Sequence, residues 1–495
     1  MQRTYAMILM PSCMIKGEAG ILMREQHKSY DICVIGAGPG GYVAAIYGAQ
    51  KGKRVALVEK DHIGGTCLNR GCIPTKTFLA AARLRRGLLK SEVFSLKKSG
   101  LQVDMGKLVK RKNGIVALLR KSIESLIKSH GVDSYKGSGR IVNSKTVEIG
   151  NAEREAGEKI LTEAIIIATG SKPGQLPGVI PDGERIITSD HAVDLSSIPK
   201  DIIIIGGGVI GIEFSSIFRN MGSKVTVIEM LPSILPTEDR EIVATLRRIL
   251  ERSGIEIRTD TKVREVKKDE KKVVVFTENQ RGEKAHYEAE KILVAAGRIP
   301  YTEGLELEDL GVRTERGFVK VNGKMETNVP GIYAIGDVVG GLMLAHAASQ
   351  EAIVAVDSIL GHPSQIDYRS IPRCIYSIPE AASVGLSEDE AIANKIAVNV
   401  GRFPFSANGK AIIEGESEGF FKVIADKEIG QIIGVHVLGE NATDLIGGGV
   451  ISMALEGTID DIEASVQAHP TLFEAFKEAV LDAKGKAIHL PPKLK

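Results

Sequence analysis

The feature that most constrains the fold is a unit of strand, glycine turn and helix that occurs twice in the chain. The first copy starts at Asp31 with the residues DICVIGAGPGG, in which an apolar strand leads into the pattern G-x-G-x-x-G formed by Gly36, Gly38 and Gly41. A helix pattern and a second apolar strand follow, and that strand ends at Glu59. The first glycine allows a tight turn, the second lets a pyrophosphate approach the backbone, and the third lets the helix pack against the strand. The segment therefore predicts a βαβ unit that binds a dinucleotide, with Glu59 accepting hydrogen bonds from ribose hydroxyls.

The second copy reads DIIIIGGGVIG, and its motif glycines are Gly206, Gly208 and Gly211. Its own second strand ends at Glu229. The first glycine and the acidic residue of this copy both lie 170 positions after their counterparts in the first copy. A constant offset indicates an internal duplication rather than two unrelated turns. Two such units predict two bound dinucleotides.

The acidic residue of the second copy indicates which nicotinamide dinucleotide binds there. A carboxylate at Glu229 would repel the 2′-phosphate of NADP. The residues that follow, Met230-Leu231-Pro232, supply no arginine to offset that repulsion. The sequence therefore favours NAD over NADP.

Length and composition limit the remaining possibilities. At 495 residues and 43% hydrophobic content, the chain can form about three globular domains with full cores. Lys+Arg at 64 nearly balances Asp+Glu at 62, and no basic run is combined with aromatic residues, which argues against a nucleic-acid partner. No apolar stretch reaches the ~18 residues of a membrane span. Five cysteines scattered over the chain are not a secreted disulfide framework, so a cytoplasmic location is expected.

A cysteine pair lies just after the first dinucleotide unit, in the segment GGTCLNRGCIPTK that contains Cys67 and Cys72. A zinc site would need about four ligands, and the other cysteines stand alone. Of these, we expect Cys33 and Cys374 to be inert core residues, because both lie in apolar runs. Residues five apart on an ideal helix have Cα atoms roughly 8–9 Å apart, whereas a disulfide needs less than about 7 Å. A Cys67–Cys72 disulfide thus requires a segment wound away from ideal geometry, which Gly71 would ease, and both a reducible and a purely structural bond remain open.

A second candidate site lies near the end of the chain, in the segment HPTLFE. His469 is followed by Pro470, which restricts the backbone before it, and by Glu474. A carboxylate that holds one imidazole nitrogen leaves the other free to act as a base. From these residues alone, a catalytic and a surface histidine are both possible.

With these motifs in place, the chain resembles the pyridine nucleotide–disulfide oxidoreductases from about Tyr30 to about Lys484. The resemblance is carried, in order, by GAGPGGY, GGTCLNRGCIPTK, IIATGS, GGGVIGIEF, AAGRIP, YAIGDV, MLAHAA and AHPTLFEA. Within the family it is similar to the members that oxidise dihydrolipoamide on lipoyl-bearing protein domains and reduce NAD. The resemblance implies an α/β fold with two Rossmann-like dinucleotide-binding domains, for FAD and NAD, and a C-terminal α+β dimerisation domain.

The same resemblance implies a division of the chain. Residues 1–29 would be a loose N-terminal extension, 30–173 with 298–365 the FAD-binding domain, 174–297 the NAD-binding domain, and 366–495 the interface domain. In the last of these, GFFKVIAD and QIIGVHVLG read as strands and are followed by helix patterns, which is typical of a separate α+β unit.

The resemblance also assigns roles to individual residues. FAD would contact Gly36, Gly38, Gly41, Glu59, Lys76, Gly139, Thr169, Gly170, Asp337 and Ala345. NAD would contact Gly206, Gly208, Gly211, Glu229, Val263 and Gly297. The catalytic set would be Cys67, Cys72, Lys76, Glu213, His469 and Glu474, with no metal ion. Cys67 and Cys72 would form a redox-active disulfide, Lys76 would pair with Glu213 near the flavin, and His469 would reach the disulfide of the other subunit in a homodimer.

Two departures and two alternatives accompany this assignment. Tyr301 stands where relatives commonly have asparagine, and Phe473 would reshape the mouth of the channel to the disulfide. One alternative is another disulfide reductase of the same family, of the glutathione type. Glu229 argues against this alternative, because such enzymes typically use NADPH and a carboxylate at this position would repel its 2′-phosphate. The other is an idle flavoprotein that serves as a docking subunit or redox sensor.

Overall fold

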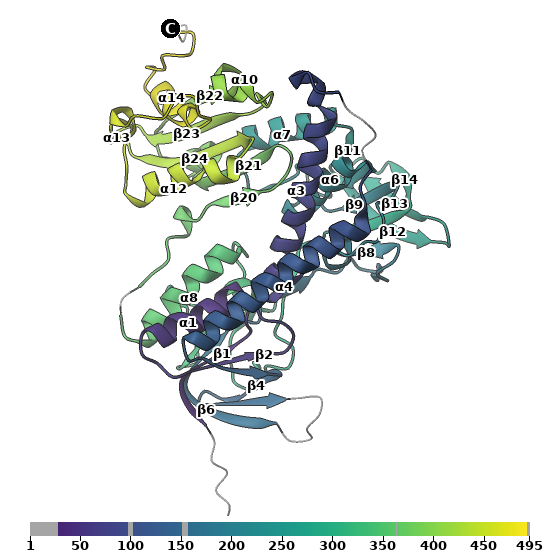
Figure 1. Ribbon diagram of the computed structural model, residues 1–495. Coiled ribbons are helices and arrows are strands. Elements are labelled where there is room, and N and C mark those ends of the chain that lie inside the picture. Colours follow the sequence, from purple (N-terminus) through teal and green to yellow (C-terminus); the bar gives the residue numbers. More distant parts are fainter. Residues whose placement is uncertain (1–27, 98–101, 151–156, 363, 493–495) are drawn as a thin grey trace, which may run out of the picture.

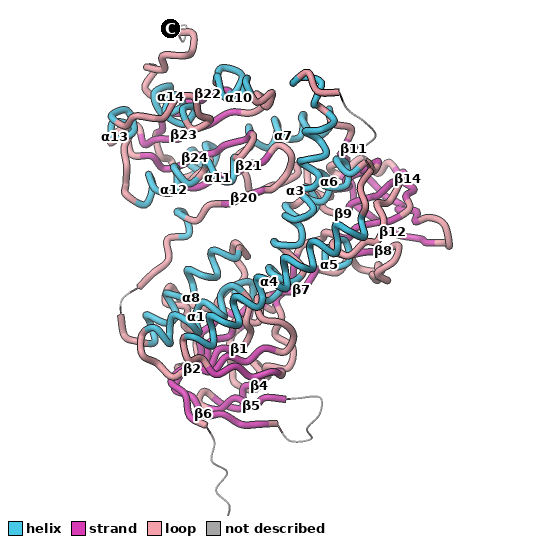
Figure 2. The backbone as a smooth tube through the Cα atoms, viewed as in Figure 1, coloured by secondary structure: helices cyan, strands magenta, loops and turns pink. Residues whose placement is uncertain are grey.

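The computed structural model describes residues 28–97, 102–150, 157–362 and 364–492. Figure 1 shows three groups of strands, each covered by helices, with the long helices α3 and α4 running between them. Figure 2 shows the same path coloured by secondary structure, with the strands of the first sheet below α1, α4 and α8. The expected N-terminal extension lies almost wholly outside the described residues. No helix in the described part of the chain is both long enough and apolar enough to cross a bilayer.

The first sheet has seven strands and contains the first dinucleotide unit. Its order is β3-β2-β1-β6-β5-β4, and β19 pairs with β6. The strands from β3 to β6 and β19 are parallel, whereas β4, β5 and β6 are antiparallel. The bounds are β1 (Ser29–Ile35), β2 (Val55–Glu59), β3 (Asp133–Lys136), β4 (Ser138–Asn143), β5 (Thr146–Gly150), β6 (Glu158–Ile167) and β19 (Ile332–Ala334).

Helices cover this sheet and extend from it. The helix of the predicted motif begins inside the motif itself, because Gly38 serves as its N-cap and Pro39 suits the first turn. Buried residues of this helix pack against β1, β2 and the small residues of α8, and together they form one hydrophobic core. The helices are α1 (Pro39–Gln50), α2 (Gly65–Asn69), α3 (Cys72–Leu89), η1 (Ser91–Phe94), α4 (Met105–Ser129), η2 (Gly336–Val339) and α8 (Ala345–Ile359).

The second sheet contains the second dinucleotide unit in the order β11-β10-β9-β15-β8, all parallel, with a three-stranded antiparallel sheet β12-β13-β14 beside it. The strands are β8 (Ile186–Ile187), β9 (Asp201–Ile205), β10 (Lys224–Ile228), β11 (Ile255–Arg258), β12 (Thr261–Lys268), β13 (Val273–Asn279), β14 (Lys284–Ala289) and β15 (Lys291–Val294). The helices are α5 (Ser189–Ala192), α6 (Val209–Met221) and α7 (Arg240–Arg252).

The third sheet is wholly antiparallel, in the order β20-β21-β24-β23-β22. Its strands are β20 (Arg373–Ile375), β21 (Glu380–Gly385), β22 (Val398–Pro404), β23 (Phe420–Asp426) and β24 (Ile432–Gly439). Its helices are η3 (Tyr368–Ser370), α9 (Glu388–Ala393), η4 (Phe405–Ala407), α10 (Gly409–Ile413), α11 (Ala442–Leu445), α12 (Gly447–Ala454), α13 (Ile459–Ala464) and α14 (Glu474–Ala483). The two segments predicted as strands here are β23 and β24, so the expected switch from strands to helices is confirmed.

Two short ladders lie outside the three main groups, and one long helix contacts all of them. The ladders are β7 (Ser171–Pro173) with β16 (Arg298–Pro300), and β17 (Thr314–Glu315) with β18 (Phe318–Val319). Helix α3 contacts both other groups: Arg85 donates to the backbone oxygen of Asn220 in α6, and Arg86 forms two hydrogen bonds with Glu416 beside the third sheet (Figure 1). Because α3 begins at Cys72, these contacts fix the cysteine segment relative to all three groups.

Candidate active site

The two predicted glycine turns have the same backbone geometry. Gly36 has φ of 103° and Gly206 has φ of 115°, both in the left-handed region that favours glycine. A Cβ atom added at Gly41 would lie 1.8 Å from the carbonyl oxygen of Gly36, and one at Gly211 would lie 1.9 Å from that of Gly206. These close approaches explain why Gly41 and Gly211 must lack a side chain, although neither faces the cavity.

The acidic residue at the end of the second strand makes the same hydrogen bonds in both copies. Each carboxylate accepts the N–H of the residue after the first glycine and an N–H two positions beyond itself. The donors are Ala37 and Asp61 for Glu59, both at 2.7 Å, and Gly207 and Leu231 for Glu229, at 2.5 and 2.7 Å. The backbone and hydrogen bonds therefore repeat, as the constant sequence offset predicts.

One cavity of about 1650 Å³ connects the two glycine turns with the cysteine segment. All predicted site residues line it except Gly41, Gly211, His469 and Glu474. At Gly170, Gly208 and Gly297 a Cβ atom would meet no other atom within 4 Å, so these backbone positions face open space. A cavity of this size, with bare backbone at two helix N-termini, suits two extended dinucleotides whose phosphates approach α1 and α6.

The cysteine segment is wound away from a continuous helix, as a disulfide between Cys67 and Cys72 would require. Cys67 lies in α2, whereas Cys72 starts α3, and the helices are separated at Arg70 and Gly71. Gly71 has φ of −112° and ψ of −109°, and a Cβ atom there would lie 3.1 Å from the carbonyl oxygen of Thr66. Both cysteines are free thiols in the structure, and their side chains are in hydrogen-bond contact.

The two thiols differ in acidity. The hydrogen bond from Cys67 lowers the pKa of Cys72 to about 7; burial opposes this shift, and the positive charge of Lys76 supports it. The same hydrogen bond, together with burial, raises the pKa of Cys67 above its ordinary value. Because its pKa is the lower of the two, Cys72 is the member of the reduced pair that ionises first, and the thiolate is the reactive form of a cysteine.

Lys76 and Glu213 form an ion pair between the first two groups of strands. Lys76 Nζ lies 3.0 and 2.8 Å from the two carboxylate oxygens of Glu213. Lys76 is one turn after Cys72 on α3, and Glu213 is in α6, directly after the second glycine turn. The Glu213 side chain is 7% exposed, against 30% for Lys76, so the lysine head faces the cavity. The pair predicted from the family resemblance is therefore present in the fold.

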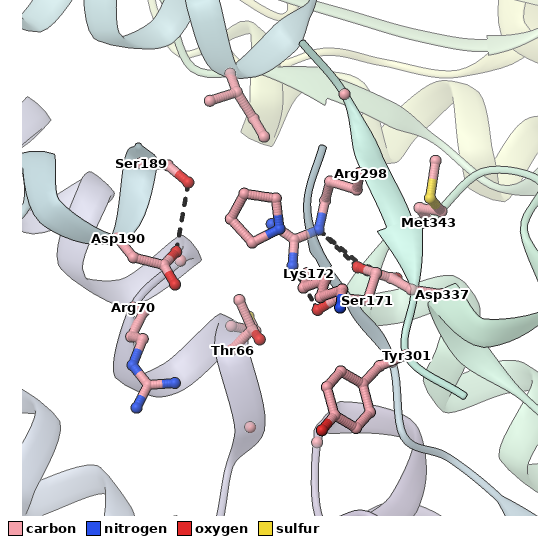
Figure 3. A pocket seen from close by; sticks show the side chains of 18 of the residues that line it. Thr66, Arg70, Ser171, Lys172, Ser189, Asp190, Arg298, Tyr301, Asp337 and Met343 are labelled. Carbon is pink, nitrogen blue, oxygen red and sulfur yellow. Dashed lines mark hydrogen bonds and ion pairs between the residues drawn. The ribbon is translucent and has the colours of Figure 1, made fainter. Parts of the chain in front are cut away.

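Asp337 belongs to a polar cluster on the cavity wall. Ser171 donates a hydrogen bond to Asp337, and Arg298 Nε lies 2.6 Å from Ser171 Oγ and 3.6 Å from Asp337 Oδ2 (Figure 3). Neither Ser171 nor Arg298 is among the site residues predicted from the sequence, although Ser171 lies in the motif IIATGS and Arg298 in AAGRIP. Their adjacency depends on the pairing of β7 with β16, which joins segments over 120 positions apart.

His469 and Glu474 interact as predicted, but away from the cavity. Nδ1 of His469 lies 2.9 Å from Glu474 Oε1, and Glu474 Oε2 accepts the N–H of Thr471. Burial would raise the pKa of Glu474, but these two hydrogen bonds outweigh burial and lower it. The His469 side chain is 79% exposed, so its second nitrogen is open to solvent. Within one chain, therefore, the histidine–carboxylate pair and the cysteine pair are not brought together.

The structure corrects the interpretation of one cysteine and shows the packing of Phe473. Cys33 is fully buried, as expected, but Cys374 is only partly buried and lines the cavity, because β20 is an edge strand beside it. The ring of Phe473 stacks on Phe476 at a centroid distance of 5.2 Å and packs with the core of the third sheet. Phe473 is therefore partly buried beside Gly448, and its expected effect on the channel to the disulfide stays a prediction.

Tyr301, the other departure, lines the cavity near Glu59. Its backbone is held by the N–H bond to Gly170 and by the hydroxyl of Thr169. Lys60 Nζ lies 3.3 Å from the centroid of its ring, and Figure 3 shows the ring on the lower side of the cavity. A cation over an aromatic face is favourable, so tyrosine here has a role that asparagine could not supply.

Known proteins resemble this chain over nearly its whole length. Residues 30–352 match the family described as pyridine nucleotide-disulphide oxidoreductase, and residues 371–480 match its dimerisation domain. A dihydrolipoyl dehydrogenase of Bacillus subtilis is 43% identical over 93% of this chain and 99% of its own. A dihydrolipoyl dehydrogenase of Thermus scotoductus is 42% identical over 94% of this chain and 99% of its own.

Solved structures share the fold as well. LpdA from Mycobacterium tuberculosis has a TM-score of 0.85 and 27% sequence identity, and the match covers 91% of this chain and 99% of that one. The HOCl-induced flavoprotein disulfide reductase RclA from Escherichia coli, solved as a Cu(II) complex, has a TM-score of 0.81 and 28% identity, over 92% and 99% of the two chains. With its repeated dinucleotide units, its cysteine pair and these matches, the chain belongs to the pyridine nucleotide-disulphide oxidoreductase family.

Proposed function

We propose that this chain is a dihydrolipoyl dehydrogenase, which oxidises protein-bound dihydrolipoamide to lipoamide and reduces NAD to NADH. One observation carries the proposal: a single cavity connects a cysteine pair, the Lys76–Glu213 ion pair and two dinucleotide-binding turns. A thiol reductant, an internal disulfide and a nicotinamide can exchange two electrons only if such groups adjoin. The relatives from Bacillus subtilis and Thermus scotoductus, named for this activity, support the choice of substrate.

FAD and NAD are the two cofactors of this oxidoreductase. The bare backbone of the cavity at both helix N-termini fits their pyrophosphates. Glu59 ends β2 and Glu229 directly follows β10, at the positions where such folds bind ribose hydroxyls. We propose that FAD is held by the first copy together with Lys76, Gly139, Thr169, Gly170, Asp337 and Ala345. We propose that NAD is held by the second copy together with Val263 and Gly297.

The proposed exchange at the cysteines balances in thiols and electrons. The substrate dithiol gives one proton to His469 and attacks the sulfur of Cys67, which breaks the Cys67–Cys72 bond and releases Cys72 as a thiolate. The second substrate thiol then displaces Cys67, so lipoamide leaves as a disulfide and the enzyme keeps two electrons as a dithiol. The positive charge of Lys76 favours the Cys72 thiolate, which makes Cys72 the better leaving group. FAD, when bound, supplies the relay of those two electrons to NAD.

The exposed His469 supports a proposal about assembly. The chain carries the dimerisation domain of its family, and within one chain His469 does not line the cavity that contains Cys67 and Cys72. We propose a homodimer in which the partner subunit's His469 serves this cysteine pair, held by the partner's Glu474. The external partners would be lipoyl-bearing domains of a 2-oxo acid dehydrogenase or glycine cleavage complex, and the location would be the cytoplasm.

The chain would divide into domains as the sequence predicts. We propose residues 30–173 with 298–365 as the FAD-binding domain, 174–297 as the NAD-binding domain, and 366–495 as the interface domain. The return of the chain as β19 to the first sheet, after the whole second sheet, supports the two-part FAD-binding domain. The β7–β16 ladder would be the point where the chain leaves that domain and re-enters it.

The test is NADH formation from dihydrolipoamide by the purified yellow protein, followed by absorbance. We expect reduction of NAD and much slower reduction of NADP. No signal with NAD would contradict the proposal, and a signal with NADP alone would favour a glutathione-type reductase. The Cys72→Ser variant should lose dithiol turnover yet keep its flavin, because FAD is held by the first copy. Loss of the flavin on that change would contradict the proposed architecture.

A further inference from the structure

Tyr376 touches the catalytic ion pair at two points. It follows β20, and its ring lines the cavity with Cys72, Lys76 and Glu213. Its main-chain N–H donates to Glu213 Oε1 at 3.0 Å, the same oxygen that accepts from Lys76. The Nζ atom of Lys76 also lies 4.2 Å from the centroid of the Tyr376 ring. The ammonium group of Lys76 is thus held between a carboxylate and an aromatic face.

This arrangement limits where the lysine charge can lie. A lysine side chain has four rotatable bonds, and a single carboxylate partner leaves its head able to swing towards solvent. An aromatic face attracts the ammonium through the negative centre of the ring and shields it from water. The head of Lys76 is partly exposed to the cavity, so the ring supplies a wall that Glu213 alone does not.

The position of Lys76 matters because Cys72 depends on its charge. Lys76 favours the Cys72 thiolate, whereas the negative charge of Glu213 disfavours it. The two effects nearly cancel unless the ammonium is closer to the sulfur than the carboxylate is, because the Coulomb energy falls with distance. A residue that fixes the ammonium on the Cys72 side of Glu213 therefore controls the ionisation of that thiol.

We propose that Tyr376 is a positioning residue whose ring holds the ammonium group of Lys76 against Glu213 and beside Cys72, and so sets the reactivity of the reduced cysteine pair. The inference rests on the proposed function only in taking Cys67 and Cys72 as the redox pair. The phenol hydroxyl makes no hydrogen bond with any described residue, so the aromatic face carries the role. Phenylalanine at position 376 should therefore keep the positioning of Lys76, whereas a non-aromatic side chain of similar size should lose it.

The test measures the pH dependence of alkylation of Cys72 by iodoacetamide, read by peptide mass spectrometry in the flavin-loaded protein. A Cys67→Ser background isolates Cys72 and keeps a hydroxyl donor at position 67. Three further substitutions are made one at a time in this Cys67→Ser background: Tyr376→Phe, Tyr376→Leu and Tyr376→Met. Flavin absorbance and thermal unfolding check that each variant folds. The two non-aromatic variants also guard against one of them failing to fold.

We expect Tyr376→Leu and Tyr376→Met to raise the alkylation midpoint by about half a pH unit or more, with Tyr376→Phe unchanged. In a Lys76→Met background, Tyr376→Leu should cause no further shift, because the ring acts through the lysine. An unchanged or lowered midpoint in both non-aromatic variants would overturn the inference, as would an equal shift in the two lysine backgrounds. These readouts need no lipoamide or NAD, so they can fail or succeed independently of the proposed activity.

Discussion

Lys422 Nζ lies 2.8 Å from Asp239 Oδ2, and the two side chains are only 3% and 2% exposed. Lys422 is in β23 of the third sheet, whereas Asp239 is the N-cap of α7 beside the second sheet. The buried ion pair therefore joins two parts of the molecule that are far apart in the sequence. Asp239 is also the last residue of the loop that connects β10 to α7. Three residues of this loop, Met230, Leu231 and Pro236, line the cavity.

The pair belongs to a row of polar residues that crosses the whole third sheet. Five register neighbours, one from each strand, form the row: Arg373, Ser383, His436, Lys422 and Arg402. Opposite them stand three acidic residues at the start of α7, namely Glu238, Asp239 and Glu241. The complementary charges fix the loop after β10 against the third sheet, so this row supports the position of a loop that lines the cavity.

The Lys422→Met variant should be strongly destabilised. Removing the ammonium leaves Asp239 buried without its partner and Glu388 without a contact at 2.8 Å. Breaking a buried ion pair on one side costs about 3–5 kcal/mol, because an uncompensated charge remains. The midpoint of urea unfolding measures the loss. Lys410→Met is the matched control: its ion pair with Glu414 is partly exposed, and it should cost at most about 0.5 kcal/mol. Equal losses in the two variants would contradict the role of the row.

His436 should make the stability depend on pH. Burial lowers its pKa to about 4; the Asp239 carboxylate opposes that shift, and the charges of Lys422 and Arg373 add to it. Its Nε2 pairs with the carbonyl oxygen of Leu386, and its Nδ1 has no hydrogen-bond partner among the described residues. The unfolded chain binds the proton near pH 6.5, whereas the folded chain stays neutral down to about pH 4.

Stability should therefore be unaffected by this histidine above about pH 6.5 and should fall by about 1.4 kcal/mol per pH unit from there to about pH 4. Comparing the urea midpoints at pH 7 and pH 5 gives the measurement. In His436→Gln the difference between the two pH values should shrink by about 2 kcal/mol, taking the same slope over one and a half units. His286→Gln, at an exposed position of β14, should leave the difference unchanged. If His436→Gln kept the full difference in stability between pH 7 and pH 5, groups other than His436 would have to cause that difference.

Local patterns predicted the parts of the molecule that depend on local geometry. The glycine turns and their carboxylates follow from spacing, because one βαβ unit fixes all of their contacts. The break between Cys67 and Cys72 is the departure from an ideal helix that a disulfide between them would require. The cavity lining of Cys374 could not be read in this way, since an apolar run is equally consistent with a core strand and an edge strand. The polar row through His436 and Lys422 is visible only once the register of five strands is known.

Glu229→Ala should weaken NAD binding selectively. The change removes both hydrogen bonds to the glycine-turn backbone and the carboxylate proposed to accept the ribose hydroxyls. Hydrogen bonds to a charged group contribute about 1.5–3 kcal/mol, so KM for NAD should rise about tenfold or more, and the preference over NADP should narrow. The matched variant is Glu59→Ala in the other copy, which should lose flavin instead. Steady-state kinetics and flavin absorbance separate the two, and a loss of flavin in Glu229→Ala would contradict the assignment of the copies.

His469→Gln should slow dithiol oxidation by about 10²–10⁴-fold, because the substrate thiol loses its general base. Electron transfer from NADH to a dye should remain, since His469 does not line the cavity of its own chain. If the site combines two subunits, mixing His469→Gln with Cys67→Ser protein after subunit exchange should restore activity. Random pairing of two inactive variants makes half of the dimers mixed, each with one intact site, so about a quarter of the wild-type rate is expected. Unmixed samples should stay inactive. If the mixture also stayed inactive while sedimentation or mass spectrometry showed mixed dimers, the base and the cysteine pair would have to come from the same chain.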